Sequence, residues 1–454
     1  MSRSRVLKEG FSLGWIEPVK SLLLGAAFSV VAHWGPAHAQ TDITDLGGDL
    51  SNDLAGRHAI QVAAPNVTSA ERIAEQAAGF PLFHRSTKLS EGLGPRFINK
   101  SCVGCHVDNG RGPAVFDNAP RRGSAMVVKI KRPGLEADGN VPEVPGLGTQ
   151  ILDHSVTGDR SRSIELSWTT ITGRYADGSF YRLRKPKLKF SEAIRLPKGT
   201  IISLRMSPHL IGLGLLEAIP SSAIFALSDA NDADRDGISG RINFVKNNVT
   251  GTYSVGRFGF KGSQPSVLQQ TAAAFYHDMQ VTNSLFFDKA GVFEASDTDL
   301  HSLAVYLKLA GVPKARDQQL NPVAEGKAVF SSISCDACHR MTFTTGSTHP
   351  DPELRNQTIH PFTDLLLHDM GSGLADGWNE FSANGREWRT APLWGLGYSA
   401  RLAPRKAVFL HDGRARTIEE AILWHGGEAY RSKQAFVELP KAKREALLQF
   451  LNSL

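Results

Sequence analysis

Two short motifs contain every cysteine of this 454-residue chain. Cys-Val-Gly-Cys-His occupies residues 102–106, and Cys-Asp-Ala-Cys-His occupies residues 335–339. Two cysteines separated by two residues and followed by histidine are the attachment signature of a c-type haem. The thiols add to the two vinyl groups, and the histidine supplies an axial nitrogen to the iron. The predicted residues are Cys102, Cys105, His106, Cys335, Cys338 and His339.

Three other uses of paired cysteines explain the pattern less well. A zinc site would require the two pairs to converge, and it would leave the histidine after each pair unexplained. A thioredoxin-like motif occurs once, after a strand, whereas both motifs here lie in helical sequence. A disulfide within such a pair is strained and closes a very short loop, so it stabilises a fold little. Two covalently bound haems are therefore the preferred interpretation.

The amino terminus has the features of an export signal. Four basic residues precede an apolar run at residues 21–32, and Ala-His-Ala at residues 37–39 is a small-x-small cleavage pattern. We expect a signal peptide over residues 1–39, with an uncleaved anchor or a misassigned start codon as the alternatives. The apolar run is too short for a stable membrane anchor. Because c-type haems are attached outside the inner membrane, the predicted location is the periplasm.

The composition sets limits on partners. A formal net charge of +6 over the whole chain is mild and argues against nucleic acid as the main partner. No second long apolar segment follows the leader, so we expect no stable membrane anchor after cleavage. The hydrophobic content of 41% is enough for the packed cores of two or three domains.

The helical pattern around each motif repeats along the chain. Before the second motif, residues 325–330 predict a short helix whose Gly326 permits close approach to another helix. Residues 441–451 carry an apolar stripe at helical spacing and predict the helix that closes the chain. Around the first motif, residues 70–84 predict the preceding helix and residues 299–307 predict the closing helix. Crossed helices around a haem predict two cytochrome c-like domains and a mainly α fold.

The predicted domains cover residues 40–310 and 323–454, with a proline-containing linker at residues 311–322. A β-hairpin and loops enlarge the first domain, because residues 164–171 alternate with period two and Asp177-Gly178 is a hairpin-turn signal. The basic stretch at residues 182–189 is either a docking patch for an acidic electron-transfer partner or a solvated edge whose lysines prevent strand pairing.

An acidic loop gives a further candidate site. Asp232, Asp234 and Asp236 alternate before Gly237, as in the first half of a calcium-binding loop. The usual glutamate at the twelfth position is replaced by Asn243. A calcium site and a plain solvated turn both fit this pattern.

The segment from Phe409 to Ala421, with His-Asp-Gly-Arg at residues 411–414, resembles the bacterial di-haem cytochrome c peroxidase superfamily. Similar stretches lie at residues 212–220, 236–241 and 388–394. The superfamily includes the maturase of the tryptophan-derived quinone of methylamine dehydrogenase. The branch most similar to this chain is that of the di-haem oxidoreductases labelled thiol oxidoreductases. That label does not suit this chain, because all four cysteines are assigned to haem attachment and no free thiol is left.

The resemblance implies axial ligands. In the peroxidases, a methionine fourteen residues after the motif histidine is the distal ligand of the second haem, and here that offset from His411 gives His425. The second haem is then expected to be ligated by two histidines, with Met370 and His368 as alternatives to His425. For the first haem, the expectation is an open or water-bound iron, or a ligand from the set His154, His209 and His277.

The resemblance also implies a function. Electrons from a small soluble donor, of cytochrome c or cupredoxin type, would pass through the second haem to a peroxide-reactive first haem. Glu217 is the candidate acid–base residue and Gln150 a second pocket residue, although Glu217 could equally pair with an arginine or cap a helix. The alternatives are maturase-like oxidation of a partner protein's side chain and a non-catalytic di-haem electron carrier.

Overall fold

The computed structural model describes residues 42–116, 119–287, 291–402 and 407–454. The predicted signal peptide, residues 1–39, lies outside the described residues. Within these ranges, no helix is both long enough and apolar enough to cross a membrane.

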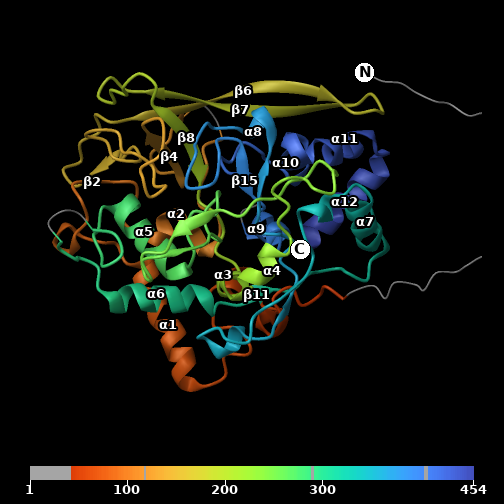
Figure 1. The fold of residues 1–454 in the computed structure, drawn as a ribbon, viewed down its shortest axis with the longest axis horizontal. Helices are drawn as coiled ribbons and strands as arrows, with labels where there is room; N and C mark the ends of the chain where they lie inside the picture. The colour runs from red at the N-terminus through yellow and green to blue at the C-terminus, as the bar shows by residue number, and fades with distance from the viewer. Residues whose placement is uncertain (1–41, 117–118, 288–290, 403–406) are drawn as a thin grey trace, which may run out of the picture. The chain divides into compact units, whose positions relative to one another are not determined.

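A pair of crossed helices accompanies the first motif. Helix α1 (Ala70–His84) packs against helix α6 (Asp297–Lys308), and Figure 1 shows the two at one end of the described unit. The contact is close, because a Cβ atom on Gly79 would lie 2.4 Å from the backbone oxygen of Ser302. No side chain larger than hydrogen fits at Gly79 without moving α6.

The second motif has a matching helix pair. Helix α7 (Asn321–Ser332) precedes the motif and packs against the closing helix α12 (Lys441–Ser453). A Cβ atom on Gly326 would lie 2.0 Å from the backbone oxygen of Ala446, so this glycine is also required by a close helix crossing. The two crossings occur at the helices that the sequence pattern predicts.

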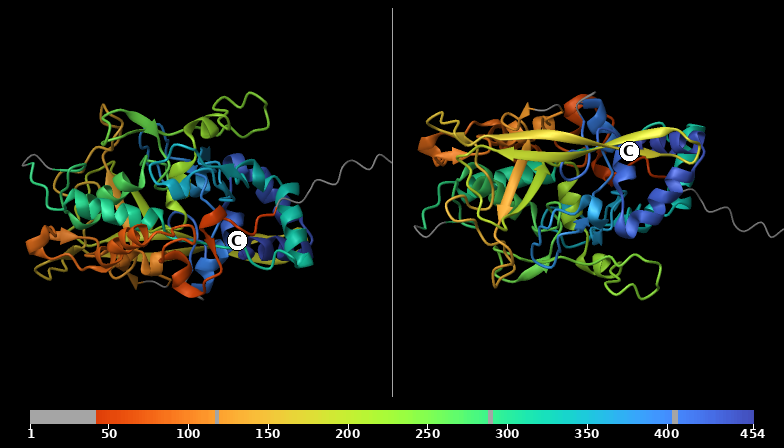
Figure 2. Two further views of the ribbon diagram at one scale, coloured as in Figure 1. Left: turned by 90° about the horizontal axis from the view of Figure 1, so that it is seen from below. Right: turned by 90° about the horizontal axis from the view of Figure 1, so that it is seen from above.

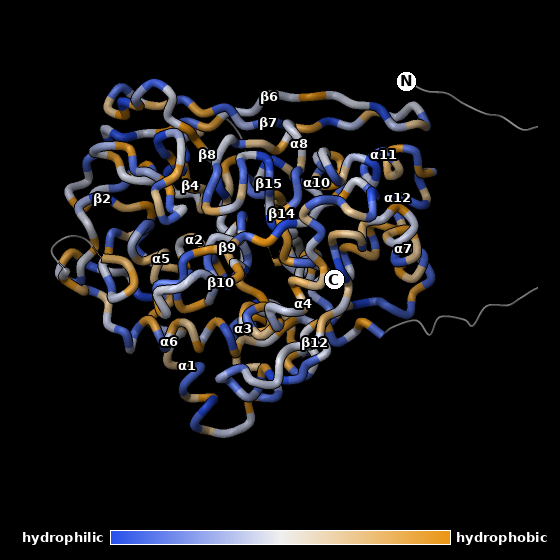
Figure 3. Tube along the Cα trace, in the orientation of Figure 1, coloured by the Kyte–Doolittle hydropathy of each residue, from blue (hydrophilic) through white to orange (hydrophobic). Residues whose placement is uncertain are grey.

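A long two-stranded hairpin lies between the first motif and helix α3. Strand β6 (Ile164–Arg174) pairs with strand β7 (Phe180–Phe190) through eleven residue pairs, and the turn contains Gly178 at φ 87°. The right-hand view in Figure 2 shows the hairpin extended across the molecule, and Figure 3 shows that hydrophilic residues dominate β7. The predicted hairpin turn is thus present. The tip of the hairpin reaches the carboxyl-terminal helices, because the amide of Ala176 donates to the carbonyl of Val437.

Most of the remaining helices and strands of the described ranges are short. The helices are α2 (Cys102–Cys105), α3 (Leu213–Ala218), α4 (Ser221–Phe225), α5 (Val267–Met279), α8 (Gly371–Leu374), α9 (Leu396–Leu402), α10 (Ile418–Trp424) and α11 (Tyr430–Glu438). The strands are β1 (Ser51–Asn52), β2 (Arg96–Phe97), β3 (Ala119–Pro120), β4 (Met126–Lys131), β5 (His154–Ser155), β8 (Ile201–Met206), β9 (Phe244–Lys246), β10 (Tyr253–Val255), β11 (Val312–Pro313), β12 (Phe343–Thr344), β13 (Thr358–Ile359), β14 (Leu367–Asp369) and β15 (Glu387–Arg389).

The fold corrects the predicted class. Helix accounts for 32% and strand for 18% of the described residues, with many small sheets, so the chain is not the mainly α cytochrome c fold expected from the sequence. The periodic segments beside the two motifs are helical, but the segments between them consist mainly of loops and small sheets, with the β6–β7 hairpin and helix α5 as the longer elements. Helical periodicity in a sequence detects helices and gives no information about loops and short strands.

Buried side chains from both halves form one large cluster. It includes Leu215 and Tyr306 before the predicted linker and Phe330, Phe362 and Phe450 after it. A second cluster fills the space between β4, β6 and β8. The predicted linker contains β11, which pairs in parallel with β1. The division of the chain at residues 311–322 stays a prediction.

Candidate functional site

The second attachment motif lines a cavity of about 230 Å³ in the carboxyl-terminal half. Both thiols and the imidazole of His339 face this cavity, together with His425 and mainly apolar side chains. Burial raises the pKa of the Cys335 thiol to about 12, so this thiol is neutral near pH 7. Exchange chemistry requires a thiolate, and the buried position therefore argues against a thiol oxidoreductase.

Two imidazoles in this cavity are oriented by backbone carbonyls. Nδ1 of His339 lies 2.9 Å from the Phe362 oxygen, and Nδ1 of His425 lies 2.7 Å from the Ala421 oxygen. Burial, with a smaller contribution from the nearby His425, lowers the pKa of His339 to about 4. Each ring is thus a neutral imidazole whose Nε2 remains available to a metal.

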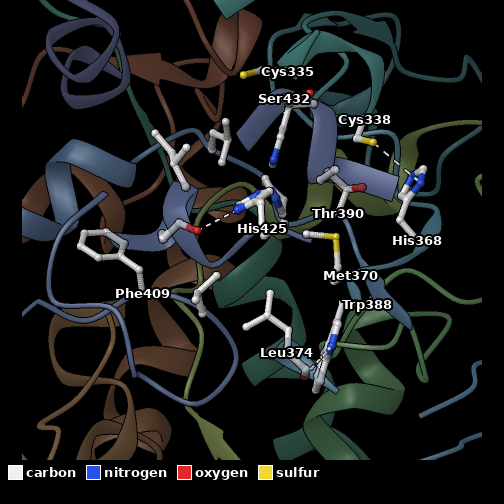
Figure 4. A pocket seen from close by; sticks show the side chains of 18 of the residues that line it. Cys335, Cys338, His368, Met370, Leu374, Trp388, Thr390, Phe409, His425 and Ser432 are labelled. Carbon is white, nitrogen blue, oxygen red and sulfur yellow. Dashed lines mark hydrogen bonds between the residues drawn. The ribbon is translucent and has the colours of Figure 1, made fainter. Parts of the chain in front are cut away.

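The alternative ligands of the second haem are placed differently (Figure 4). Nδ1 of His368 lies 2.7 Å from Glu428 Oε2, and its Nε2 lies 2.8 Å from Asp364 Oδ2. Although burial opposes protonation, these two carboxylates raise the pKa of His368 well above its ordinary value. A ring with both nitrogens engaged and protonated cannot bind iron. Met370 lines the cavity beside His425 and remains the second candidate.

The family motif at residues 411–414 supports the segment that leads to His425. The buried ring of His411 stacks on Trp388, with 3.8 Å between ring centroids. Asp412 pairs with Arg414 at 2.7 Å, and Arg414 donates to the carbonyl of Gly373 at 2.6 Å. Helix α10 follows directly and ends beside His425. The motif therefore anchors the start of the segment that leads to the candidate distal ligand.

The first attachment motif lines a cavity of about 360 Å³ in the amino-terminal half. Cys102, Cys105 and His106 all belong to its lining. Nδ1 of His106 lies 2.8 Å from the oxygen of Pro208, which orients the ring as His339 is oriented in the other half. Burial lowers the pKa of His106 to about 4, so the ring is neutral.

The three histidines proposed as distal ligands of this haem differ in position. His154 is not among the residues that line the cavity, and its ring stacks on Phe97. His209 lines the cavity with its Nδ1 2.8 Å from Ser399 Oγ, and it directly follows Pro208, the residue that orients His106. His277 lines the cavity from helix α5. The described geometry therefore favours His277 over His154 if this iron has a protein ligand.

Carboxyl groups in the amino-terminal cavity were missed by the sequence analysis. Asp278 lines the cavity, and its Oδ1 accepts a hydrogen bond of 2.8 Å from Nε2 of Gln150. Burial raises the pKa of Asp278 and favours its neutral form. Glu380 also lines the cavity, and Lys129 and Arg205 lower its pKa although burial opposes this. The predicted pocket residue Gln150 is therefore in the cavity and positions an acid.

Glu217 lies elsewhere. Its Oε2 accepts the amide of Val267 in the first turn of α5, and its Oε1 lies 3.4 Å from Nε2 of His349. Glu217 is not among the residues that line either cavity. The contacts are those of a helix cap, the structural alternative for this residue. Among the described residues, its one hydrogen bond with a cavity-lining residue comes from the backbone amide of Val267, and its catalytic role stays a prediction.

The two cavities adjoin and can be tested for their fit to haem. Six lining residues belong to both cavities: Arg111, His209, Phe260, Arg389, Ala391 and Pro392. Haem carries two propionate carboxylates, which require donors in a buried site. The buried Nε atoms of Arg111 and Arg257 have no hydrogen-bond partner among the described residues. Paired thiols, a neutral imidazole and unsatisfied guanidinium donors together fit a covalently bound haem in each cavity.

The acidic loop brings its three aspartates together. Carboxylate oxygens of Asp232, Asp234 and Asp236 lie within 4.8 Å of one another. The amide of Gly237, at φ 90°, donates to Asp232 Oδ1 at 3.1 Å. Asn243 is buried and bonds to Lys261 and Ser382, so it does not complete the loop.

Comparison with known proteins identifies the family. The family model described as "Di-haem oxidoreductase, putative peroxidase" matches residues 144–293 and 287–454, which is more than half of the chain. No curated protein matches the chain. Among solved structures, a hydrazine synthase of Kuenenia stuttgartiensis pressurized with 20 bar xenon is similar over 97% of this chain and 100% of that chain, at 12% identity and a TM-score of 0.38. A TM-score of 0.38 is too low to establish a shared fold. The chain belongs to the di-haem oxidoreductase family, which makes it a haem-binding oxidoreductase.

Proposed function

We propose that the protein is a periplasmic di-haem c-type oxidoreductase of peroxidase type. Electrons from a small soluble donor enter at the carboxyl-terminal haem and pass to the amino-terminal haem, where peroxide is reduced. The observation that carries this proposal is the pair of adjoining cavities, each with one complete attachment motif. The six shared lining residues leave a short distance for electron transfer between the centres.

The residues of the chain supply and guide protons. Bound haem supplies an iron that exchanges single electrons and binds small oxygen ligands. Cleavage of the peroxide O–O bond requires a proton at the departing oxygen. Because Gln150 donates to Oδ1 of Asp278, the proton of the neutral acid is held on Oδ2. Asp278 is thus the acid of the site, and Gln150 positions it. Reduction of one peroxide to two waters takes two electrons and two protons.

The coordination of the amino-terminal iron decides between this proposal and a second one. If Nε2 of His277 binds that iron, both haems are six-coordinate and the protein is an electron carrier. The presence of His277 in the cavity is the observation in favour of this reading. Electron paramagnetic resonance of the ferric holoprotein tests the choice. We expect one high-spin and one low-spin signal, whereas two low-spin signals would establish the carrier.

A basic surface near the carboxyl-terminal haem suits an acidic donor. Strand β7 exposes Arg182, Lys185, Lys187 and Lys189. The side chain of Arg416 donates to the Arg182 carbonyl, which joins this strand to the segment before α10. An acidic donor bound there would lie over the segment that carries His425. The same lysines also protect an edge strand, because β7 is the outer strand of its sheet.

Substitution of His425 by methionine is expected to raise the reduction potential of the carboxyl-terminal haem. A thioether favours ferrous iron relative to imidazole. The matched control is Met370→Leu, which changes a side chain of the same cavity and is expected to leave the potential unchanged. Potentiometric titration with optical detection measures both variants. A shift in Met370→Leu with none in His425→Met would assign the ligand to Met370.

Calcium is expected to raise the melting temperature of the holoprotein through the loop of Asp232, Asp234 and Asp236. Three converging carboxylates bind a hard cation, and a ligand at a hundred times its dissociation constant stabilises the native state by about 2.7 kcal/mol. The Asp234→Asn variant should lose the calcium-dependent shift. Equal melting temperatures of the parent in calcium and in chelator would show that the loop is a solvated turn.

A further inference from the structure

Arg111 and Arg389 lie where the two cavities meet, and each of these arginines lines both cavities. Arg111 follows the first attachment motif, and its Nη1 and Nη2 donate to the carbonyls of Val408 and Leu410 at 2.6 and 2.8 Å. Arg389 comes from the other half, in strand β15, and its Nε donates to the carbonyl of Gly259 at 3.1 Å. Each arginine thus reaches across to the backbone of the opposite half.

Neither guanidinium group has an anionic partner in the part of the chain that the structure describes. Among the described residues, no carboxylate lies within ion-pair distance of Arg111 or Arg389, and the buried Nε of Arg111 has no acceptor. The carboxylate that acts on Arg111 is Asp412, which already pairs with Arg414. Arginine keeps its proton in proteins, so both charges persist although the two side chains are half-buried in the cavity walls. A buried charge without a counter-charge is costly, and such groups are normally paired.

We propose that Arg111 and Arg389 are shared anchors that bind propionate carboxylates where the two haems meet, and so raise the reduction potentials of both. This inference rests on the proposed pair of covalently bound haems. A guanidinium fork matches a carboxylate in geometry and charge. A positive charge near a haem stabilises the ferrous form, because reduction adds a negative charge to the centre. Because each arginine adjoins both cavities, loss of one charge acts on both haems.

Arg257 provides a matched comparison within the same chain. It is buried, its Nε has no partner among the described residues, and it lines the amino-terminal cavity but not the carboxyl-terminal one. Its Nη2 donates to the carbonyl of Ile219 at 2.9 Å, so it resembles Arg111 in bonding to backbone. Arg257 is therefore expected to influence one haem, whereas Arg111 influences two.

The test compares Arg111→Gln, Arg111→Lys and Arg257→Gln holoproteins by optical redox titration, after mass measurement has counted the covalent haems. In Arg111→Gln, we expect the ferric-to-ferrous ratio at a fixed potential to rise at least tenfold for both haems, which is 59 mV for a one-electron couple. In Arg257→Gln, we expect that shift for the amino-terminal haem alone. Arg111→Lys keeps the charge and should retain most of both parent potentials.

Three outcomes would overturn the inference. An Arg111→Gln protein with both haems attached and neither potential shifted would show that Arg111 is only a structural donor to backbone. A shift in one haem alone would show that Arg111 is not shared. If Arg111→Gln does not fold, Arg389→Gln takes its place and must shift the reduction potentials of both haems. An Arg389→Gln protein that shifts neither potential would then overturn the inference. A parent protein with fewer than two covalent haems would contradict the proposed function instead, and the mass measurement reveals this first.

Discussion

Replacement of Cys102 and Cys105 together by alanine is expected to leave a protein with one covalent haem instead of two. Replacement of Cys335 and Cys338 should have the same effect on the other haem. The two motifs line separate cavities, so each pair of thiols serves its own cofactor. Mass measurement of the denatured variants counts the haems that remain bound.

The pair of double variants acts as its own control. The optical spectrum of each should retain the signals of the haem that its intact motif binds, because the proposed axial ligands of the two haems differ. A double variant that still carries two covalent haems would contradict the assignment of the motifs. Loss of both haems from either variant would show that attachment at one site depends on the other.

Replacement of Asp278 by asparagine is expected to slow peroxide cleavage by roughly 10²–10⁴-fold, the range for loss of a positioned acid–base group. Asparagine keeps the volume and the contact with Gln150 but cannot carry the proton. In the parent, the rate should fall as the pH rises through the raised pKa of Asp278, because the neutral acid is then lost. Stopped-flow mixing of the holoprotein with peroxide measures both effects.

Glu217→Gln is the matched control for this experiment. Glu217 caps helix α5 outside both cavities, so its amide variant should cleave peroxide at the parent rate. A slow Glu217→Gln protein together with a normal Asp278→Asn protein would return the acid–base role to Glu217. Binding of small ligands to the iron should survive in both variants, since neither change removes an iron ligand.

Features that depend on a few neighbouring residues could be predicted from the sequence. Short patterns of residues predict the attachment motifs and the hairpin turn at Gly178. They also predict the two helices whose close crossing requires glycine at residue 326. His425 was reached through the fourteen-residue offset in a related family, and the structure places it in the cavity of the second motif. Whether it ligates iron stays a prediction.

The sequence failed where burial depends on tertiary structure. The apolar residues around Glu217 suggested a dry pocket, but the short helix α3 directs this side chain to the first turn of α5. Asp278 and Arg111 lie in segments with no distinctive pattern, so nothing in the sequence marks them as buried charges. Apart from the hairpin at β6 and β7, most strands between the motifs are too short to give a periodic signal, and the predicted fold class was wrong for that reason.

Steady-state turnover of the purified holoprotein with peroxide and a reduced small cytochrome c tests the central claim most directly. We expect the parent to oxidise the cytochrome in proportion to enzyme and peroxide, with two cytochromes oxidised for each peroxide. The variant that lacks Cys102 and Cys105 should be inactive while it still accepts electrons. A parent protein with both haems attached that oxidises no cytochrome and consumes no peroxide would contradict the account.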